Sequence, residues 1–204
     1  MNLVVLLVLS QFPTDVFDNP TPFEEVETKD GVKVSRREVK GSPYSENRIE
    51  LATPYTPKDL CDAVYEWGTH KNDGPAVMLH KVVSDGENVR VVYNQITQPV
   101  VANRDYSLTI VRSYLDDGKC RIRFRATNEH APPKPDGFVR MNKVWGEWIF
   151  EPLSDGGGKV TYTLFSDPAG AVPPFLVHGA ARGAAREAAL LGVQKAKQAL
   201  EARK

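Results

Sequence analysis

Two stretches of alternating hydrophobic and polar residues occupy the last third of the chain, at residues 145–153 and 160–167. An Asp-Gly-Gly-Gly sequence at residues 155–158 separates them, and such a turn between alternating runs predicts an antiparallel hairpin. Because no proline follows Pro174, the remaining residues to Lys204 predict one helix of about 29 residues. At about 1.5 Å per residue this helix would be roughly 44 Å long, enough to cross the sheet of a small domain.

Shorter alternating runs fill the chain upstream of this hairpin. They predict strands at residues 32–40, 46–53, 77–83, 89–97, 106–114, 120–127 and 138–150. Residues 23–29 predict a short turn of helix, and Thr56 with Pro57 marks the start of a longer helix that ends at Gly68. Segregated strands and helices are typical of an α+β fold, and a large twisted antiparallel sheet curls. The chain therefore predicts a curved antiparallel β-sheet wrapped around the long C-terminal α-helix.

The curl of the sheet around the helix would enclose an interior, and the alternation identifies its walls. Even-numbered positions within residues 104–114 are larger and more apolar than odd-numbered ones, so they should point inward. Alternate positions of neighbouring strands and one stripe of the helix complete the walls. The candidate wall residues, which would bind a ligand, are Val91, Tyr93, Tyr106, Leu108, Ile110, Arg112, Ile122, Phe124, Trp148, Val177, Ala181, Ala184 and Ala188.

Small residues dominate the helix stripe, which continues to Leu191. Such residues either let a helix approach the sheet closely or leave a cavity beneath it, and the sequence leaves both alternatives open. An empty cavity of ligand size would be costly, so a cavity implies a ligand. Tyr93, Tyr106 and Arg112 are the candidates for orienting that ligand.

Charge and cysteine content narrow the class of protein. Lysine plus arginine and aspartate plus glutamate number 26 each, so the net charge is zero, which argues against binding of nucleic acid. Alternating arginines at positions 121, 123 and 125 should share a solvated outer face of the sheet. Cys61 and Cys120 lie far apart in sequence, and we expect two free or buried thiols.

No group of residues has the spacing of a metal or catalytic site. The histidines His70, His80, His130 and His178 are too far apart in sequence to form a local pair of metal ligands. Glu129 and His130 adjoin at the end of a predicted strand, where a surface pair is expected rather than an acid–base pair. We therefore expect no metal, no cofactor and no catalytic residue.

The N-terminal residues differ in composition from the rest. Residues 3–9 are seven consecutive apolar residues, too few for a membrane span of about 20. They fit the h-region of a signal peptide, which would make the protein an exported one, or else an element that packs on the domain. Three prolines in residues 11–22 predict a linker. We expect a leader and linker at residues 1–19 and one domain at residues 20–204, in a compartment that the sequence leaves open.

Four stretches of the chain resemble motifs of the START domain, the steroidogenic-acute-regulatory-protein-related lipid-transfer module of the helix-grip (SRPBCC, Bet v 1-like) superfamily. They are the proline and Arg-Asp-Tyr of residues 99–106, the Gly-Phe-Val-Arg of residues 133–140, the Trp-Ile-Phe-Glu-Pro-Leu of residues 148–153, and the Asp-Pro-Ala-Gly entry to the last helix at residues 167–177. Their order and spacing match across roughly residues 23–200, so the chain is similar to a bacterial-type, single-domain member.

The resemblance implies a helix-grip fold with an apolar tunnel that holds one lipid or sterol, in a monomer that contacts membranes transiently. Some members place an arginine and an acid in the tunnel, but Ile110 and Val91 stand at those positions here. The leading hypothesis is binding, and transfer, of a lipid or other hydrophobic small molecule without catalysis. The alternatives are a cyclase- or aromatase-like enzyme on the same fold and a protein-interaction domain with a filled core.

Overall fold

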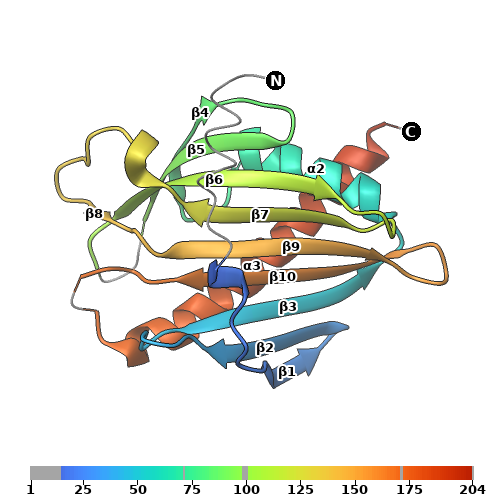
Figure 1. Cartoon of the computed structure of the whole chain (residues 1–204), viewed down its shortest axis with the longest axis horizontal. Helices are drawn as coiled ribbons and strands as arrows, with labels where there is room; N and C mark the ends of the chain where they lie inside the picture. Colours follow the sequence, from blue (N-terminus) through green and yellow to red (C-terminus); the bar gives the residue numbers. More distant parts are fainter. Residues whose placement is uncertain (1–14, 71, 98–100, 171, 204) are drawn as a thin grey trace.

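A curved antiparallel sheet and one long C-terminal helix dominate the fold, which confirms the predicted α+β class (Figure 1). The computed structural model describes residues 15–70, 72–97, 101–170 and 172–203, so most of the predicted leader lies outside the described residues. Helices α2 (Pro57–His70) and α3 (Pro174–Glu201) lie on the same face of the sheet. Their side of the sheet is called the concave face below, and the other side the outer face.

The strands follow one another in the order β1-β2-β3-β10-β9-β7-β6-β5-β4, each antiparallel to its neighbours. This order places the third strand beside the last one, so β3 and β10 join the two halves of the sheet. The strands are β1 (Glu24–Lys29), β2 (Val32–Glu38), β3 (Ser45–Thr53), β4 (Val77–Ser84), β5 (Val89–Ile96), β6 (Arg104–Tyr114), β7 (Cys120–Ala126), β9 (Val144–Pro152) and β10 (Gly158–Ser166). Two short 3-10 helices, η1 (Asp15–Phe17) and η2 (Asn128–His130), and the two-residue strand β8 (Val139–Arg140) complete the elements.

Two predicted elements differ from the structure. Residues 23–29 contain strand β1 rather than a helical turn, because Asp30 and Gly31 adopt positive φ angles of 53° and 74° and form a two-residue hairpin with β2. The single strand predicted at residues 138–150 is interrupted, since β8 (Val139–Arg140) runs parallel to β6 whereas β9 pairs with β7 and β10. A change of pairing partner breaks the strand, and alternation does not reveal such a change.

Small residues let α3 approach the sheet closely along the C-terminal half of the helix. Its buried residues are Ala185, Ala189, Gly192 and Ala196. A Cβ atom at Gly192 would lie 2.8 Å from the Trp148 ring, so a larger residue would push the helix away from the sheet. Ala184 is exposed, which corrects the predicted stripe, because the packed face of the helix is offset by one residue at this position.

Residues 15–23, which precede β1, cross the outer face of the sheet (Figure 1). The Phe17 ring lies 4.5 Å from the guanidinium of Arg123, and the Phe23 ring lies 3.6 Å from that of Arg48. Cation–π contacts of this kind contribute about 0.5–1 kcal/mol each at exposed sites. The arginines at positions 121, 123 and 125 share the outer face, as predicted, but they are half-buried, so this part of the face is only partly solvated.

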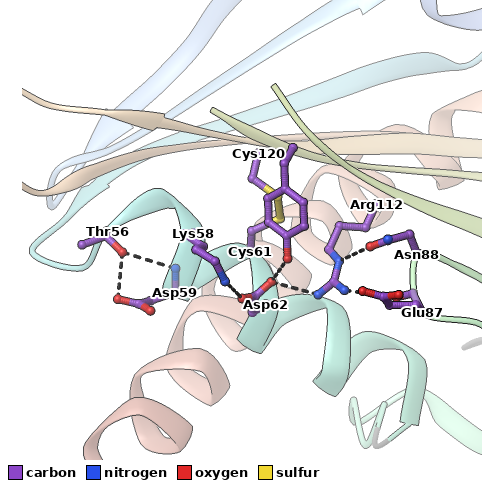
Figure 2. The surroundings of a disulfide bond; sticks show 10 residues. Thr56, Lys58, Asp59, Cys61, Asp62, Glu87, Asn88, Arg112 and Cys120 are labelled. Carbon is purple, nitrogen blue, oxygen red and sulfur yellow. Dashed lines mark hydrogen bonds and ion pairs between the residues drawn. A yellow bond between two sulfur atoms is a disulfide. The ribbon is translucent and has the colours of Figure 1, made fainter. Parts of the chain in front are cut away.

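A disulfide joins α2 to the first residue of β7 (Figure 2). Cys61 and Cys120 are 59 positions apart in sequence, and their Cα atoms are 6.1 Å apart in the structure. Both residues are buried. The prediction of two free or buried thiols is wrong, because only the packing of α2 against the sheet brings the two cysteines together. Structural disulfides persist mainly in oxidising compartments.

Replacing both cysteines, Cys61→Ala together with Cys120→Ala, should lower the free energy of unfolding by about 2–5 kcal/mol, because the crosslink restricts a long loop of the unfolded chain. Urea unfolding of the variant and of the wild type measures the difference. Wild-type protein unfolded in a reducing agent is the matched control and should lose a similar amount. An unchanged unfolding midpoint in both samples would show that the crosslink contributes nothing to stability.

Candidate functional site

The register between strands decides which side chains of the sheet face the two helices. Leu108 and Ile110 of β6 lie directly opposite Val92 and Arg90 of β5, and directly opposed residues share one face of a sheet. Leu108, Ile110 and Val92 belong to the same buried cluster as the inward alanines of α3. Tyr106, two positions before Leu108 in β6, lies on the same face. The predicted inward direction of these β6 residues therefore agrees with the register.

Val91 and Tyr93 lie on the outer face, which corrects their assignment to the interior. Their partners in β6 are Thr109 and Ser107, which alternate with the inward residues. The Tyr93 hydroxyl donates a hydrogen bond to Asp105 Oδ2 at 2.9 Å, within a polar network of the outer face. Because positions 91 and 92 are both valine, the alternation by itself fits either face.

The remaining wall residues predicted on the sheet continue the apolar surface of the concave face. Ile122 lies opposite Trp148, and Phe124 lies opposite Gly146. Trp148 packs against Tyr162 of β10 with their ring centroids 4.2 Å apart. The apolar surface thus runs without interruption from β6 to β10.

Two phenols on this surface have no hydrogen-bond partner among the residues that the structure describes. Tyr106 is half-buried and Tyr162 is buried. Burial raises the pKa of the Tyr106 hydroxyl to about 12, and burial together with the nearby Tyr106 raises the pKa of Tyr162. Both hydroxyls therefore keep their protons at neutral pH, and each can donate a hydrogen bond to a bound molecule.

Asn94 is a polar residue of the concave face that alternation did not single out. It is 1% exposed and lies directly opposite Tyr106. His80 Nε2 donates a hydrogen bond to the Thr69 carbonyl oxygen at 2.8 Å, so Nδ1 of the neutral ring accepts one from the Asn94 amide at 2.7 Å. One amide atom of Asn94 is left without a partner in the described part of the chain. A buried polar atom without a partner costs about 1–3 kcal/mol, so Asn94 is a candidate contact for a ligand. The signal in the sequence is one amide inside a strand that is otherwise largely apolar.

Arg112 belongs to the concave face, but its guanidinium is held by α2 and by the loop before β5 (Figure 2). Nη1 donates to Asp62 Oδ1 at 2.8 Å, and Nε donates to Asn88 Oδ1 at 3.0 Å. The Tyr65 ring lies 4.5 Å from the guanidinium, and the side chain is only 10% exposed. This placement indicates that Arg112 attaches α2 to the sheet, and we expect this role rather than the orientation of a ligand.

The predicted wall residues of α3 occupy different environments. Ala188 is half-buried and packs against the main core cluster. Val177 and Ala181 line a pocket of about 240 Å³ beside the first turns of the helix, together with residues of β2 and β3. Ala184 lies between these groups in sequence and is exposed. The structure therefore offers two candidate positions for a ligand, the apolar concave face and this pocket.

Neither α2 nor α3, the α-helices of the described residues, is long and apolar enough to cross a membrane. In the same part of the chain, no three His, Cys, Asp or Glu side chains gather as potential metal ligands. The polar groups of the concave face include phenols, the amides of Asn94 and Asn47, and several arginines, of which α2 neutralises Arg90 and Arg112.

A curved antiparallel sheet that closes around a long C-terminal helix is the helix-grip fold. The START domain family matches residues 26–200, and the chain belongs to this family. An uncharacterized protein of Pseudomonas aeruginosa is 27% identical over 157 residues, which are 74% of this chain and 74% of that protein.

Two solved structures illustrate the likeness in fold. The STAR-related lipid transfer protein of Xanthomonas axonopodis has a TM-score of 0.71 and 24% identity, over 84% of this chain and 96% of that chain. Human STARD10 has a TM-score of 0.75 and 15% identity, over 94% of this chain and 79% of that chain. At these identities the likeness shows the shared fold.

Replacing Arg112 by leucine should lower the free energy of unfolding by about 2–4 kcal/mol, less than for a fully buried pair because Asp62 keeps Lys58 as a partner. Binding of lipid by the folded variant should remain unchanged. Urea unfolding and a lipid titration measure the two effects, and the exposed Arg203→Leu is the matched control. Altered lipid selectivity at unchanged stability would show that Arg112 contacts the ligand.

Proposed function

We propose that the protein binds one lipid or other hydrophobic small molecule between the concave face and α3, and carries it without transforming it. Membership of the START domain family supports this proposal. So does the shared fold with a Xanthomonas axonopodis protein that is named a lipid transfer protein.

The environment of Tyr106 is the observation that carries the proposal. Its side chain is half-buried, whereas Leu108 and Ile110 further along the same face of β6 are buried, so part of the Tyr106 ring is uncovered on an otherwise apolar face. Its hydroxyl has no hydrogen-bond partner among the described residues and can donate one to a bound molecule. A surface of this kind suits an apolar ligand that carries one polar group.

Partly buried apolar side chains surround this interior on several elements. Ile96 and Leu164 pack against the main core cluster but remain half-buried, as does Ala188 on α3. A ligand that covered these side chains would remove their remaining apolar area from water, which contributes about 25 cal/mol per Å². Burial of this kind favours any apolar molecule of suitable size, and the polar groups then decide its orientation.

A cyclase- or aromatase-like enzyme on this fold would need an acid–base group in the interior. The described residues of the concave face offer Tyr106 and Tyr162, whose raised pKa values keep them protonated at neutral pH, and His80, which lies opposite Asn94. Both ring nitrogens of His80 are already engaged, one by Asn94 and one by the Thr69 carbonyl oxygen. No free base therefore stands beside the phenols among these residues, and the site favours binding over catalysis. The third alternative is a protein-interaction domain whose core is filled by its own side chains. A bound molecule would distinguish the carrier and the enzyme from this alternative.

Native mass spectrometry of the full chain, purified without detergent, should show a mass above that of the polypeptide, because an apolar interior retains its ligand. Solvent extraction followed by mass analysis identifies the bound molecule. Delipidated protein incubated with mixed-lipid vesicles should regain the added mass. Protein that stays ligand-free in both experiments would favour the filled core.

Replacing Ala188 by leucine should weaken binding of a neutral fluorescent lipid at least severalfold, because the added atoms occupy ligand space. Stability of the delipidated form should hold or rise, since the leucine gains apolar burial of up to about 1.5–3 kcal/mol. Ala184→Leu, at an exposed position of the same helix, is the matched control and should change neither quantity.

The stability of Ala188→Leu distinguishes a hollow from a tightly packed interior. Tight packing around this alanine would make the substitution destabilising by about 1–3 kcal/mol. A destabilised variant with unchanged lipid binding would count against the proposed position of the ligand.

A further inference from the structure

The pocket beside the first turns of α3, called the edge pocket below, differs in chemistry from the apolar concave face. Its volume is about 240 Å³. Three elements contribute to it, namely the end of β2, the start of β3 and the N-terminal turns of α3. Its lining residues are Arg36, Tyr44, Ser45, Asn47, Val177, His178, Gly179, Ala181 and Arg182.

Positive charge dominates the edge pocket. Arg36 and Arg182 line it from opposite elements, and the lining contains no aspartate or glutamate. Within the described part of the chain, neither guanidinium makes an ion pair or a hydrogen bond, in contrast to Arg90 and Arg112. The first turn of α3 also lacks an acidic residue, so the positive end of the helix dipole adds to the same field.

Asn47 is a second, independent sign that the edge pocket binds a polar group. Its residue is 5% exposed, and its side chain lines the pocket. No hydrogen bond of this side chain is formed with any residue that the structure describes. The amide is not among the buried side-chain groups that lack a partner, so it is accessible from the pocket and free to donate a hydrogen bond there. A ligand with acceptor oxygens would satisfy the amide donor.

The edge pocket lies at one end of an apolar row on the concave face. Asn47 is directly opposite Arg36 of β2 on one side and Leu164 of β10 on the other. The row continues through Gly146 of β9 to Phe124 of β7. A chain-like ligand with its polar end at Asn47 would therefore extend along apolar side chains toward the middle of the sheet.

The volume of the edge pocket suits a headgroup and not a whole lipid, because complete ligand sites measure about 300–1,000 Å³. We propose that the edge pocket binds an acidic oxyanion, a carboxylate or a phosphate, which is the headgroup of an amphipathic ligand. Arg36 and Arg182 contact the anion, Asn47 donates a hydrogen bond to it, and the apolar chain lies along the Leu164–Phe124 row. This inference rests on the proposed function for the position of the chain, but the anion site can be tested without it.

Affinities of the delipidated full chain for palmitate and for hexadecanol test the headgroup directly, because the two ligands share a chain and differ in charge. Displacement of a fluorescent fatty-acid probe measures both. The double variant Arg36→Gln with Arg182→Gln should bind palmitate about tenfold or more weakly, which corresponds to the loss of one or more charge-assisted hydrogen bonds. Hexadecanol should bind it as it binds the wild type.

Arg186→Gln is the matched control, since it removes the same charge one turn further along α3 and outside the edge pocket. It should leave both affinities unchanged. The palmitate affinity of the wild type should fall with added salt, whereas that of the double variant should not. Because Arg36 and Arg182 are exposed, their replacement should leave the fold intact, and thermal unfolding checks this.

Calorimetric titration with inorganic phosphate separates a lipid headgroup from a free anion. Phosphate binding that disappears in the double variant supports the anion site. If the wild type binds phosphate in this way but does not bind hexadecanol, the proposed function is rejected and the anion site is not. An unchanged preference for palmitate over hexadecanol in the double variant would overturn the anion site. Equal losses for palmitate and hexadecanol would overturn it as well, because a headgroup site acts only on the charged ligand.

Discussion

The close contact between α3 and Trp148 is the constraint on which the rest of the structure depends. Gly192 lies against the Trp148 ring, where a Cβ atom would come within 2.8 Å. Trp148 packs in turn against Tyr162, so this contact joins the helix to the hairpin of β9 and β10. The buried residues of α3 all lie in its C-terminal half. The buried contacts of the helix are therefore concentrated in its C-terminal half, while its first turns border the edge pocket.

Helix α2 neutralises the charged part of the concave face. Arg90 and Arg112 project toward the helices, where an unpaired charge would be costly. α2 supplies Glu66 and Asp62 as their partners, and the ring of Tyr65 contacts both guanidiniums. The disulfide fixes the same helix to β7. With these charges paired beneath α2, the middle of the concave face, from Leu108 through Phe124 to Leu164, is apolar.

Polar groups stand at two separated places around that apolar surface. Asn94 and Tyr106 lie on β5 and β6, whereas Asn47 and Arg36 lie on β3 and β2 at the opposite side of the sheet. An apolar middle would supply most of the burial, and polar ends would fix the orientation of the ligand.

Alternation and punctuation in the sequence determined most strands, the long terminal helix and the α+β class, because side-chain period and turn residues are local properties. The inward direction of Leu108 and Ile110 also followed from one strand alone. Other assignments depended on contacts between elements that are distant in sequence. The register of β5 against β6 turned Val91 outward, and the packing of α2 paired Cys61 with Cys120 and gave Arg112 its acidic partner. The edge pocket depended on three such elements at once, so only the tertiary structure could bring Arg36, Asn47 and Arg182 together.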